Sequence, residues 1–240
     1  KDTAIYGISS IAGKFINYLL VPIQTAAFAA AGGEYGVVTN IYAYTALLMV
    51  ILTYGMETAF FRFANKTEED VRKVYSTTLV SVGSTALLFI AVVLLLLPQI
   101  AGFMKYSDHP DWVAVMFACV AIDAFKCIYQ KRPVKFATLQ IVNITLNIVF
   151  NLIYLIVLPA WKINLFGLYD EQFTLNVGMV FYINLVCTVI VLLCFKAELT
   201  GFRYTFDKAL WRRMIRYAWP LLILGIAGIL NQTLDKIIFP

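Results

Sequence analysis

A lysine lies in the middle of the first long apolar run of the chain. The run GISSIAGKFINYLLVPIQT, residues 7–25, places its polar residues at steps of three and four, with Val21 filling the one gap: Gly7, Ser10, Lys14, Asn17 and Gln24. These steps predict one polar stripe on an otherwise apolar helix. Lys14 lies about ten residues into the run, roughly 15 Å deep at ~1.5 Å per residue. A cation there costs at least ~2.5–3.5 kcal/mol unless it faces water, a partner or a substrate. We therefore expect Lys14 to face an internal cavity; the alternative is a side chain that snorkels to the headgroups.

Three asparagines form a second pattern. Asn143, Asn147 and Asn151 recur every four residues in an apolar run and so share one helix face. One interpretation is interhelical hydrogen bonding, at about 0.6 kcal/mol per bond in membranes. The other is a wall that binds sugar, because amides both donate and accept hydrogen bonds and so suit hydroxyl-rich ligands. The sequence leaves both open, but either one predicts that this face points into the protein.

Charged residues near helix ends complete the candidate binding set. Glu57 lies about four residues from the end of its run. At that position the sequence fits a solvated or paired carboxylate as well as a functional one. Arg62 is either a boundary residue or a phosphate receptor at a cavity mouth. In the last run, adjacent Asp235 and Lys236 cannot face the same way, so at most one of them lines a cavity with Asn231.

Patterns typical of catalysis are missing from the sequence. There is no G-x-S-x-G, no P-loop, no His/Cys set at metal-ligand spacing and no acidic cluster for a metal. The single histidine, His109, is expected at the surface. Charges inside apolar helices favour moving a substrate over transforming it, so we predict no enzyme, no cofactor and no metal.

The composition indicates what positions these residues. Of 240 residues, 61% are hydrophobic and 14% charged, against about a quarter charged in soluble domains. Because a spanning helix needs ~20 residues, we predict an all-α transmembrane protein with seven apolar runs: Ile5–Phe28, Val37–Phe61, Ser76–Leu97, Trp112–Tyr129, Leu139–Leu158, Val177–Phe195 and Tyr217–Phe239. The first run has no cleavage site and is predicted to span the membrane rather than to be a signal peptide.

Basic residues gather in alternate loops. Fourteen lie in the loops after the second, fourth and sixth runs, whereas the other loops hold only Lys105 and Lys162. The positive-inside rule then predicts a cytoplasmic N-terminus. This distribution explains the net charge of +5 as membrane topology, so we predict no nucleic-acid binding.

Two segments depart from simple spans. The stretch before the last run predicts an amphipathic helix on the inner membrane surface at 201–216, with Thr205 or Asp207 as its N-cap. We therefore expect three parts: a first transmembrane lobe at 1–200, this linker helix, and the start of a second lobe at 217–240. The fourth run is short, which predicts a re-entrant helix or missing residues between Cys127 and Lys131.

Several stretches resemble the oligosaccharide-lipid flippases of the multidrug/oligosaccharidyl-lipid/polysaccharide exporter superfamily, closest to the bacterial O-antigen and capsule type. The resemblance covers essentially the whole chain, and its most specific stretches are AIYGISSIAGKFINYLLVP (4–22), YGMETAFFRF (54–63) and KRPVKFA (131–137), with LNQTLDKIIFP (230–240) also similar. It implies a MATE-like transporter of two six-helix lobes, of which the chain has the six-helix N-terminal lobe plus helix 7. It also implies alternating access without ATP in a bacterial inner membrane.

The resemblance implies a cargo as well. It would be an undecaprenyl-pyrophosphate-linked oligosaccharide, with Lys14 and Arg62 neutralising the pyrophosphate and the asparagines contacting sugar while the prenyl tail stays in membrane lipid. The coupling ion, H+ or Na+, is left open. The alternatives are a multidrug antiporter of the same fold, which would want an anionic cavity, and a membrane-embedded transferase or non-transporting scaffold.

Overall fold

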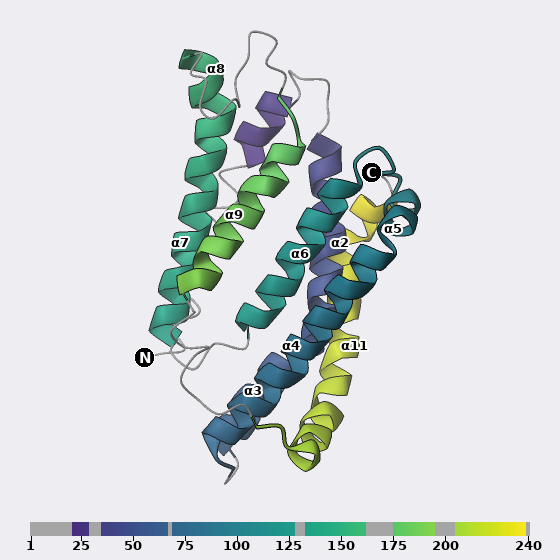
Figure 1. The fold of residues 1–240 in the computed structure, drawn as a ribbon, viewed down its shortest axis with the longest axis vertical. Helices are drawn as coiled ribbons and strands as arrows, with labels where there is room; N and C mark the ends of the chain where they lie inside the picture. Colours follow the sequence, from purple (N-terminus) through teal and green to yellow (C-terminus); the bar gives the residue numbers. More distant parts are fainter. Residues whose placement is uncertain are drawn as a thin grey trace. The chain divides into compact units, whose positions relative to one another are not determined.

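The computed structural model describes residues 21–28, 35–66, 69–127, 133–161, 175–194 and 205–238. Within these ranges every regular element is a helix (Figure 1). Among the described residues, four stretches are long and apolar enough to cross a membrane: Tyr35–Asn65, Val71–Leu95, Thr138–Ala160 and Lys208–Leu234. A shorter apolar helix spans Gly178–Cys194. The predicted all-α transmembrane class is therefore confirmed, while the MATE-like lobe arrangement stays a prediction.

The chain divides into two compact units. The first contains Lys1–Thr39 and Arg132–Val191, and the second contains Asn40–Lys131 and Leu192–Pro240. Helix α2 (Tyr35–Thr53) begins in the first unit and continues into the second.

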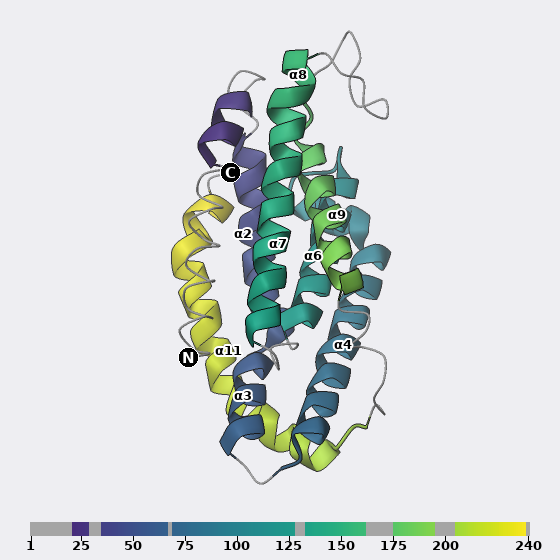
Figure 2. The same cartoon turned by 90° about the vertical axis from the view of Figure 1, so that its left-hand side faces the viewer.

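In the first unit, one long helix lies antiparallel beside a shorter one. Helix α7 (Pro133–Leu152) continues through a π-helical turn, η1 (Ile153–Val157), into α8 (Leu158–Trp161). Helix α9 (Gly178–Cys194) runs back along α7 (Figures 1 and 2). The predicted run Leu139–Leu158 is thus one continuous helical element, but the π turn adds a residue to one of its turns. Such turns are rare and frequent at functional sites.

The second unit is built around the antiparallel pair α4 (Val71–Leu95) and α6 (Pro110–Cys127). Phe89 and Phe117 have ring centroids 5.8 Å apart, and a Cβ on Gly83 would lie 3.2 Å from the Phe125 ring. The small residue lets the two helices approach closely. The elements of this unit, besides most of α2, are α3 (Met56–Lys66), α4 (Val71–Leu95), α5 (Leu97–Phe103), α6 (Pro110–Cys127) and α11 (Lys208–Ile238).

The predicted helix Val37–Phe61 is interrupted. Tyr54 and Gly55 have φ values of 36° and 71°, which end α2 and start α3. A Cβ on Gly55 would lie 2.9 Å from the carbonyl oxygen of Ala218 in α11. Glycine is the residue that adopts this φ without steric cost, and here it also leaves room for the backbone of a second helix.

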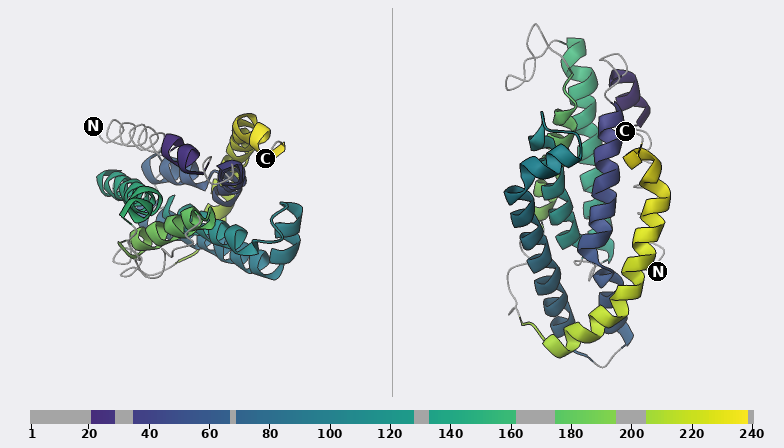
Figure 3. Two further views of the ribbon diagram at one scale, coloured as in Figure 1. Left: turned by 90° about the horizontal axis from the view of Figure 1, so that it is seen from above. Right: turned by 90° about the vertical axis from the view of Figure 1, so that its right-hand side faces the viewer.

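The predicted linker helix and the last predicted span form one element in the structure. Helix α11 begins at Lys208, after the N-cap Asp207, and continues to Ile238 with Pro220 inside it. Pro220 has no N–H to donate to the carbonyl of Arg216. Figure 3 shows α11 curving from a course beneath α3 and α4 to a course along α2. The amphipathic and spanning segments are therefore joined by a curved helix rather than by a loop.

Candidate functional site

Side-chain amides of the first unit form a continuous chain of hydrogen bonds. Gln24 Nε2 donates to Asn151 Oδ1 at 3.3 Å, and Asn151 Nδ2 donates to Asn147 Oδ1 at 3.0 Å and to its carbonyl at 2.8 Å. Asn147 Nδ2 donates in turn to Asn184 Oδ1 on α9 at 3.1 Å. We call these four residues the amide chain. It links the helix at 21–28, α7 and α9 through polar contacts.

Two members of the amide chain are buried and two are half-buried, and their bonds to one another agree with the predicted inward-pointing face. Asn151 is fully buried and Gln24 is 6% exposed, while Asn143 and Asn147 are half-buried. Unpaired amides in an apolar interior cost several kcal/mol, so the reciprocal bonds offset that penalty. In this conformation the Asn147 and Asn151 amides bind other protein groups, which favours the interhelical interpretation for these two.

One turn away from the Asn147–Asn184 bond, two buried oxygens have no hydrogen-bond partner in the described part of the chain: Asn143 Oδ1 on α7 and Thr188 Oγ1 on α9. Asn143 lies four residues before Asn147, and Thr188 lies four residues after Asn184. Because α7 and α9 are antiparallel, both steps run in the same direction, and the two oxygens lie at one level. We call this pair the open rung. Thr188 is fully buried, so the open rung can accept and donate a hydrogen bond in an apolar setting.

A second polar contact fixes α9 against the π turn. The Asn176 N–H donates to Tyr154 Oη at 2.8 Å, and Tyr154 Oη donates to the Asn176 carbonyl at 3.3 Å. The Asn176 side chain caps α9 by accepting from the Gly178 N–H at 2.7 Å. These bonds set the register of α9 along α7, and with it the alignment of Asn184 with Asn147.

In the second unit, hydrogen bonds surround the break between α2 and α3. Tyr54 Oη and Ser81 Oγ lie 2.6 Å apart, and Trp211 Nε1 donates to the same Ser81 Oγ at 2.7 Å. One α4 hydroxyl therefore holds both the break and the start of α11. This arrangement fixes where α3 presents Glu57 and Arg62.

Arg62 stacks on an aromatic ring of α11. Its Cζ lies 4.3 Å from the ring centroid of Tyr217, and the side chain is exposed. A cation over the face of a tyrosine ring is attracted by the ring quadrupole, so this contact favours one position of the Arg62 side chain against α11. Glu57, five residues earlier on α3, is half-buried.

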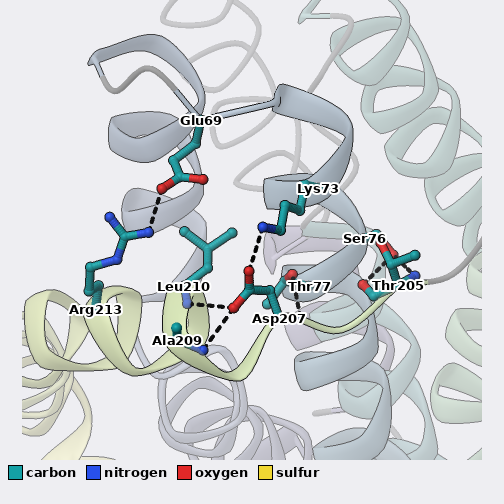
Figure 4. Close-up of polar contacts among 9 residues, drawn as sticks. All are labelled: Glu69, Lys73, Ser76, Thr77, Thr205, Asp207, Ala209, Leu210 and Arg213. Atoms are coloured by element: carbon teal, nitrogen blue, oxygen red, sulfur yellow. Dashed lines mark hydrogen bonds and ion pairs between the residues drawn. The ribbon is translucent and has the colours of Figure 1, made fainter.

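The N-terminus of α11 is fastened to the N-terminal end of α4 (Figure 4). Asp207 accepts from the N–H groups of Ala209 and Leu210 at 2.8 and 3.0 Å and pairs with Lys73 at 2.5 Å. The Lys73 ammonium, with the Leu210 N–H, lowers the pKa of Asp207 from 3.8 to about 2. Arg213 forms an ion pair with Glu69.

Hydroxyl contacts lie beside these ion pairs. The Thr205 N–H donates to Ser76 Oγ at 2.6 Å, and Ser76 Oγ donates to the Thr205 carbonyl at 2.7 Å. Together the contacts hold the α11 start in one place on α4.

Comparison with known proteins gives one match. The family model described as polysaccharide biosynthesis protein matches residues 1–240. The chain belongs to the polysaccharide biosynthesis protein family. No curated protein and no solved structure gives a significant match. The polysaccharide biosynthesis family is that of the O-antigen and polysaccharide flippases of the multidrug/oligosaccharidyl-lipid/polysaccharide superfamily, so the resemblance seen in the sequence is confirmed. Its members are transporters rather than enzymes.

The family assignment and the helices together establish a multi-pass membrane protein of polysaccharide biosynthesis and transport. The structure brings together Gln24, Asn147 and Asn151 of the predicted binding set, with Asn143 on the same face. Arg62 and Glu57 belong to α3 of the second unit, and Asn231 is exposed on α11. Lys14, Asn17 and the side chain of Asp235 lie outside the described part of this polysaccharide biosynthesis family member.

Sequence reasoning missed the α9 side of the site. Asn184 and Thr188 are spaced four residues apart in an apolar helix, the same signal that singled out Asn143 and Asn147. Applied to α9, that spacing would have found both residues. In the described residues no group of three His, Cys, Asp or Glu side chains could hold a metal.

Proposed function

We propose that this polysaccharide biosynthesis family member flips an undecaprenyl-pyrophosphate-linked oligosaccharide across a bacterial inner membrane for export of surface polysaccharide. The observation that carries the proposal is the family match over residues 1–240. Buried amides and a stacked arginine on apolar helices support it, because they suit a cargo that carries both hydroxyls and phosphates.

The pyrophosphate would be held by cations. In this mechanism Lys14 neutralises one phosphate from the polar stripe of residues 7–25, and Arg62, which lies against Tyr217, binds phosphate oxygens through its guanidinium donors. Neither residue breaks or forms a bond. Their role is to lower the electrostatic cost of bringing a doubly charged group among apolar helices.

The sugar would be recognised at the open rung. The amides of Asn147 and Asn151 bond with other protein groups, whereas Asn143 Oδ1 and Thr188 Oγ1 have no partner among the residues that the structure describes. A sugar hydroxyl can donate to the former and accept from the latter. The remaining residues of the predicted set, Asn17, Asn231 and Asp235, stay proposals for contacts along the same path.

The proposal includes a topology. The chain would comprise a first lobe at 1–200, the amphipathic segment at 201–216 and the start of a second lobe at 217–240. The two lobes would move relative to each other in alternating access. The N-terminus would be cytoplasmic, as would the loop after α3. A cysteine placed at Asn65 that reacts with an impermeant reagent from outside intact cells would contradict this orientation.

The experiment that tests the function uses two substitutions of Lys14. Lys14→Arg keeps the charge, and we expect it to keep most export, because a guanidinium also pairs with phosphate oxygens. Lys14→Met keeps the stem and relieves ~2.5–3.5 kcal/mol of insertion cost, so it should be as abundant in the membrane as the parent yet fail to export surface polysaccharide. Normal export by a folded, inserted Lys14→Met protein would overturn the cationic mechanism.

A further inference from the structure

One exposed stripe of α11 changes chemistry along its length. Residues spaced by four, four, three and four positions share this helix face, and all of them are exposed: Lys208, Arg212, Arg216, Trp219 and Ile223. Trp219 is 61% and Ile223 55% exposed. We call these five residues the interfacial stripe. Three cations come first along the chain, then an indole, then an aliphatic side chain.

The opposite face of α11 is fixed against the protein. Leu210, Met214 and Ala218 are at most 1% exposed, on a helix that packs against α3 and α4. The ion pair of Asp207 with Lys73 (Figure 4) locks this orientation. The hydrogen bond from Trp211 to Ser81 does the same. The interfacial stripe therefore points away from the second unit, and Arg212 and Arg216 cannot reach inward without undocking the helix.

The order of residues matches a membrane boundary read from water to hydrocarbon. Lys and Arg bind anionic headgroups, Trp concentrates at the headgroup level, and aliphatic side chains contact acyl chains. Arg216 lies about 4.5 Å before Trp219 along the axis, and Ile223 about 6 Å beyond it, at ~1.5 Å per residue. These steps place a cation, an indole and an aliphatic group against successive parts of a single lipid molecule. Of the most apolar window of α11, 11% is buried against the described residues.

We propose that the interfacial stripe binds one anionic phospholipid of the inner leaflet, with its phosphate between Arg212 and Arg216, its glycerol region against Trp219 and an acyl chain along Ile223. The argument for a membrane lipid is charge complementarity. Arg212 and Arg216 are exposed one turn apart, and the phosphate of an anionic lipid carries the opposite charge. The neighbouring Arg213 differs, because its guanidinium is occupied by Glu69. The bound lipid would hold the start of α11 at the membrane surface. This inference does not rest on which cargo the protein transports.

The test measures lipid binding to the full-length protein in detergent. Phosphatidylglycerol or zwitterionic phosphatidylethanolamine is titrated, and native mass spectrometry gives the dissociation constant of the first lipid bound. We expect the parent to prefer phosphatidylglycerol. Each basic residue near an anionic surface contributes about fivefold, so Arg212→Gln with Arg216→Gln should reduce that preference by roughly 25-fold.

Two variants serve as controls. Arg213→Gln removes a neighbouring, ion-paired charge and should leave the preference within about twofold of the parent, because Arg213 is turned toward Glu69. Arg212→Lys with Arg216→Lys keeps both charges and should retain most of the preference for phosphatidylglycerol. An unchanged preference in the double glutamine variant, or an equal loss in Arg213→Gln, would overturn the proposal. The proposal would also be overturned if the double glutamine variant lost undecaprenyl pyrophosphate binding but bound phosphatidylglycerol normally. The interfacial stripe would then belong to the cargo site.

Discussion

Two glycines one turn apart on α11 provide a matched test of how this helix packs against α2. A Cβ on Gly225 would lie 2.8 Å from Cγ1 of Val50, whereas a Cβ on Gly228 would meet nothing within 4 Å. The two substitutions Gly225→Ala and Gly228→Ala therefore add the same methyl group to the same helix. They differ in whether that methyl group collides with α2.

The expected difference follows from this geometry. Each substitution gains the helix propensity of alanine, about 0.8–1 kcal/mol, and this gain cancels when the two variants are compared. A carbon–carbon contact of 2.8 Å is about 1 Å inside the optimal separation of ~3.5–4.0 Å. Overpacking of this kind costs about 1–3 kcal/mol. We expect Gly225→Ala to be less stable than Gly228→Ala by that amount.

The assay is thermal unfolding of both purified variants in the same detergent. At about 2–4 °C per kcal/mol for a chain of this size, the melting temperatures should differ by roughly 2–12 °C, with Gly228→Ala the higher. Adding Val50→Ala removes the colliding methyl groups, so it should recover most of the loss in Gly225→Ala and little in Gly228→Ala. Equal melting temperatures, or no recovery by Val50→Ala, would refute the close approach of α11 to α2.

Three further predictions concern the break, the α11 cap and the asparagines. Gly55→Ala should lower stability by about 1–2 kcal/mol for the positive φ alone, and the new methyl group would add a collision with the carbonyl oxygen of Ala218. The measurement is a melting temperature, which should be lower than that of the parent. The pKa of Asp207 is lowered to about 2, so its contribution to stability is complete above pH ~4 and lost as the pH falls toward 2. Between about pH 4 and 2, the melting temperature of Asp207→Asn should therefore fall less than that of the parent. Asn151→Leu should destabilise by about 1–3 kcal/mol, because it strands Gln24, whereas Asn143→Leu should leave the melting temperature unchanged or raised but impair export. Equal export by Asn143→Leu and parent would remove the open rung from the mechanism.

The features predictable from the sequence are those that depend on local pattern. Long apolar runs predict spanning helices because hydrocarbon leaves the backbone no other partner. The four-residue spacing of asparagines correctly predicts a face that points into the protein, where Asn147 and Asn151 bond with other side chains. Asp207 is the N-cap because a carboxylate before a helix start accepts its free N–H groups. Each of these inferences needs residues from only one segment.

Features that depend on contacts between distant segments were not predictable in the same way. Apolar sequence continues through Tyr54 and Gly55, so hydropathy indicates one helix. The break is held by the hydrogen bond between Tyr54 and Ser81 of α4, and it lies where a Cβ on Gly55 would meet the carbonyl of Ala218. The π turn at Ile153–Val157 is entirely apolar apart from Tyr154 and carries no local signal. The pairing of Asn147 with Asn184 depends on the register of α9 along α7. Lys14 and Asn17 stay predictions.

The central claim is that the protein moves a lipid-linked oligosaccharide, and a flipping measurement tests it most directly. The full-length protein is reconstituted into vesicles that contain an undecaprenyl-pyrophosphate-linked oligosaccharide in both leaflets, and an added glycosidase removes sugar only from the outer one. With protein present, we expect cleavage to proceed from about half of the lipid to nearly all of it, more slowly for Lys14→Met than for Lys14→Arg. Cleavage that stops at half under every proton and sodium gradient, as in vesicles without protein, would contradict the account.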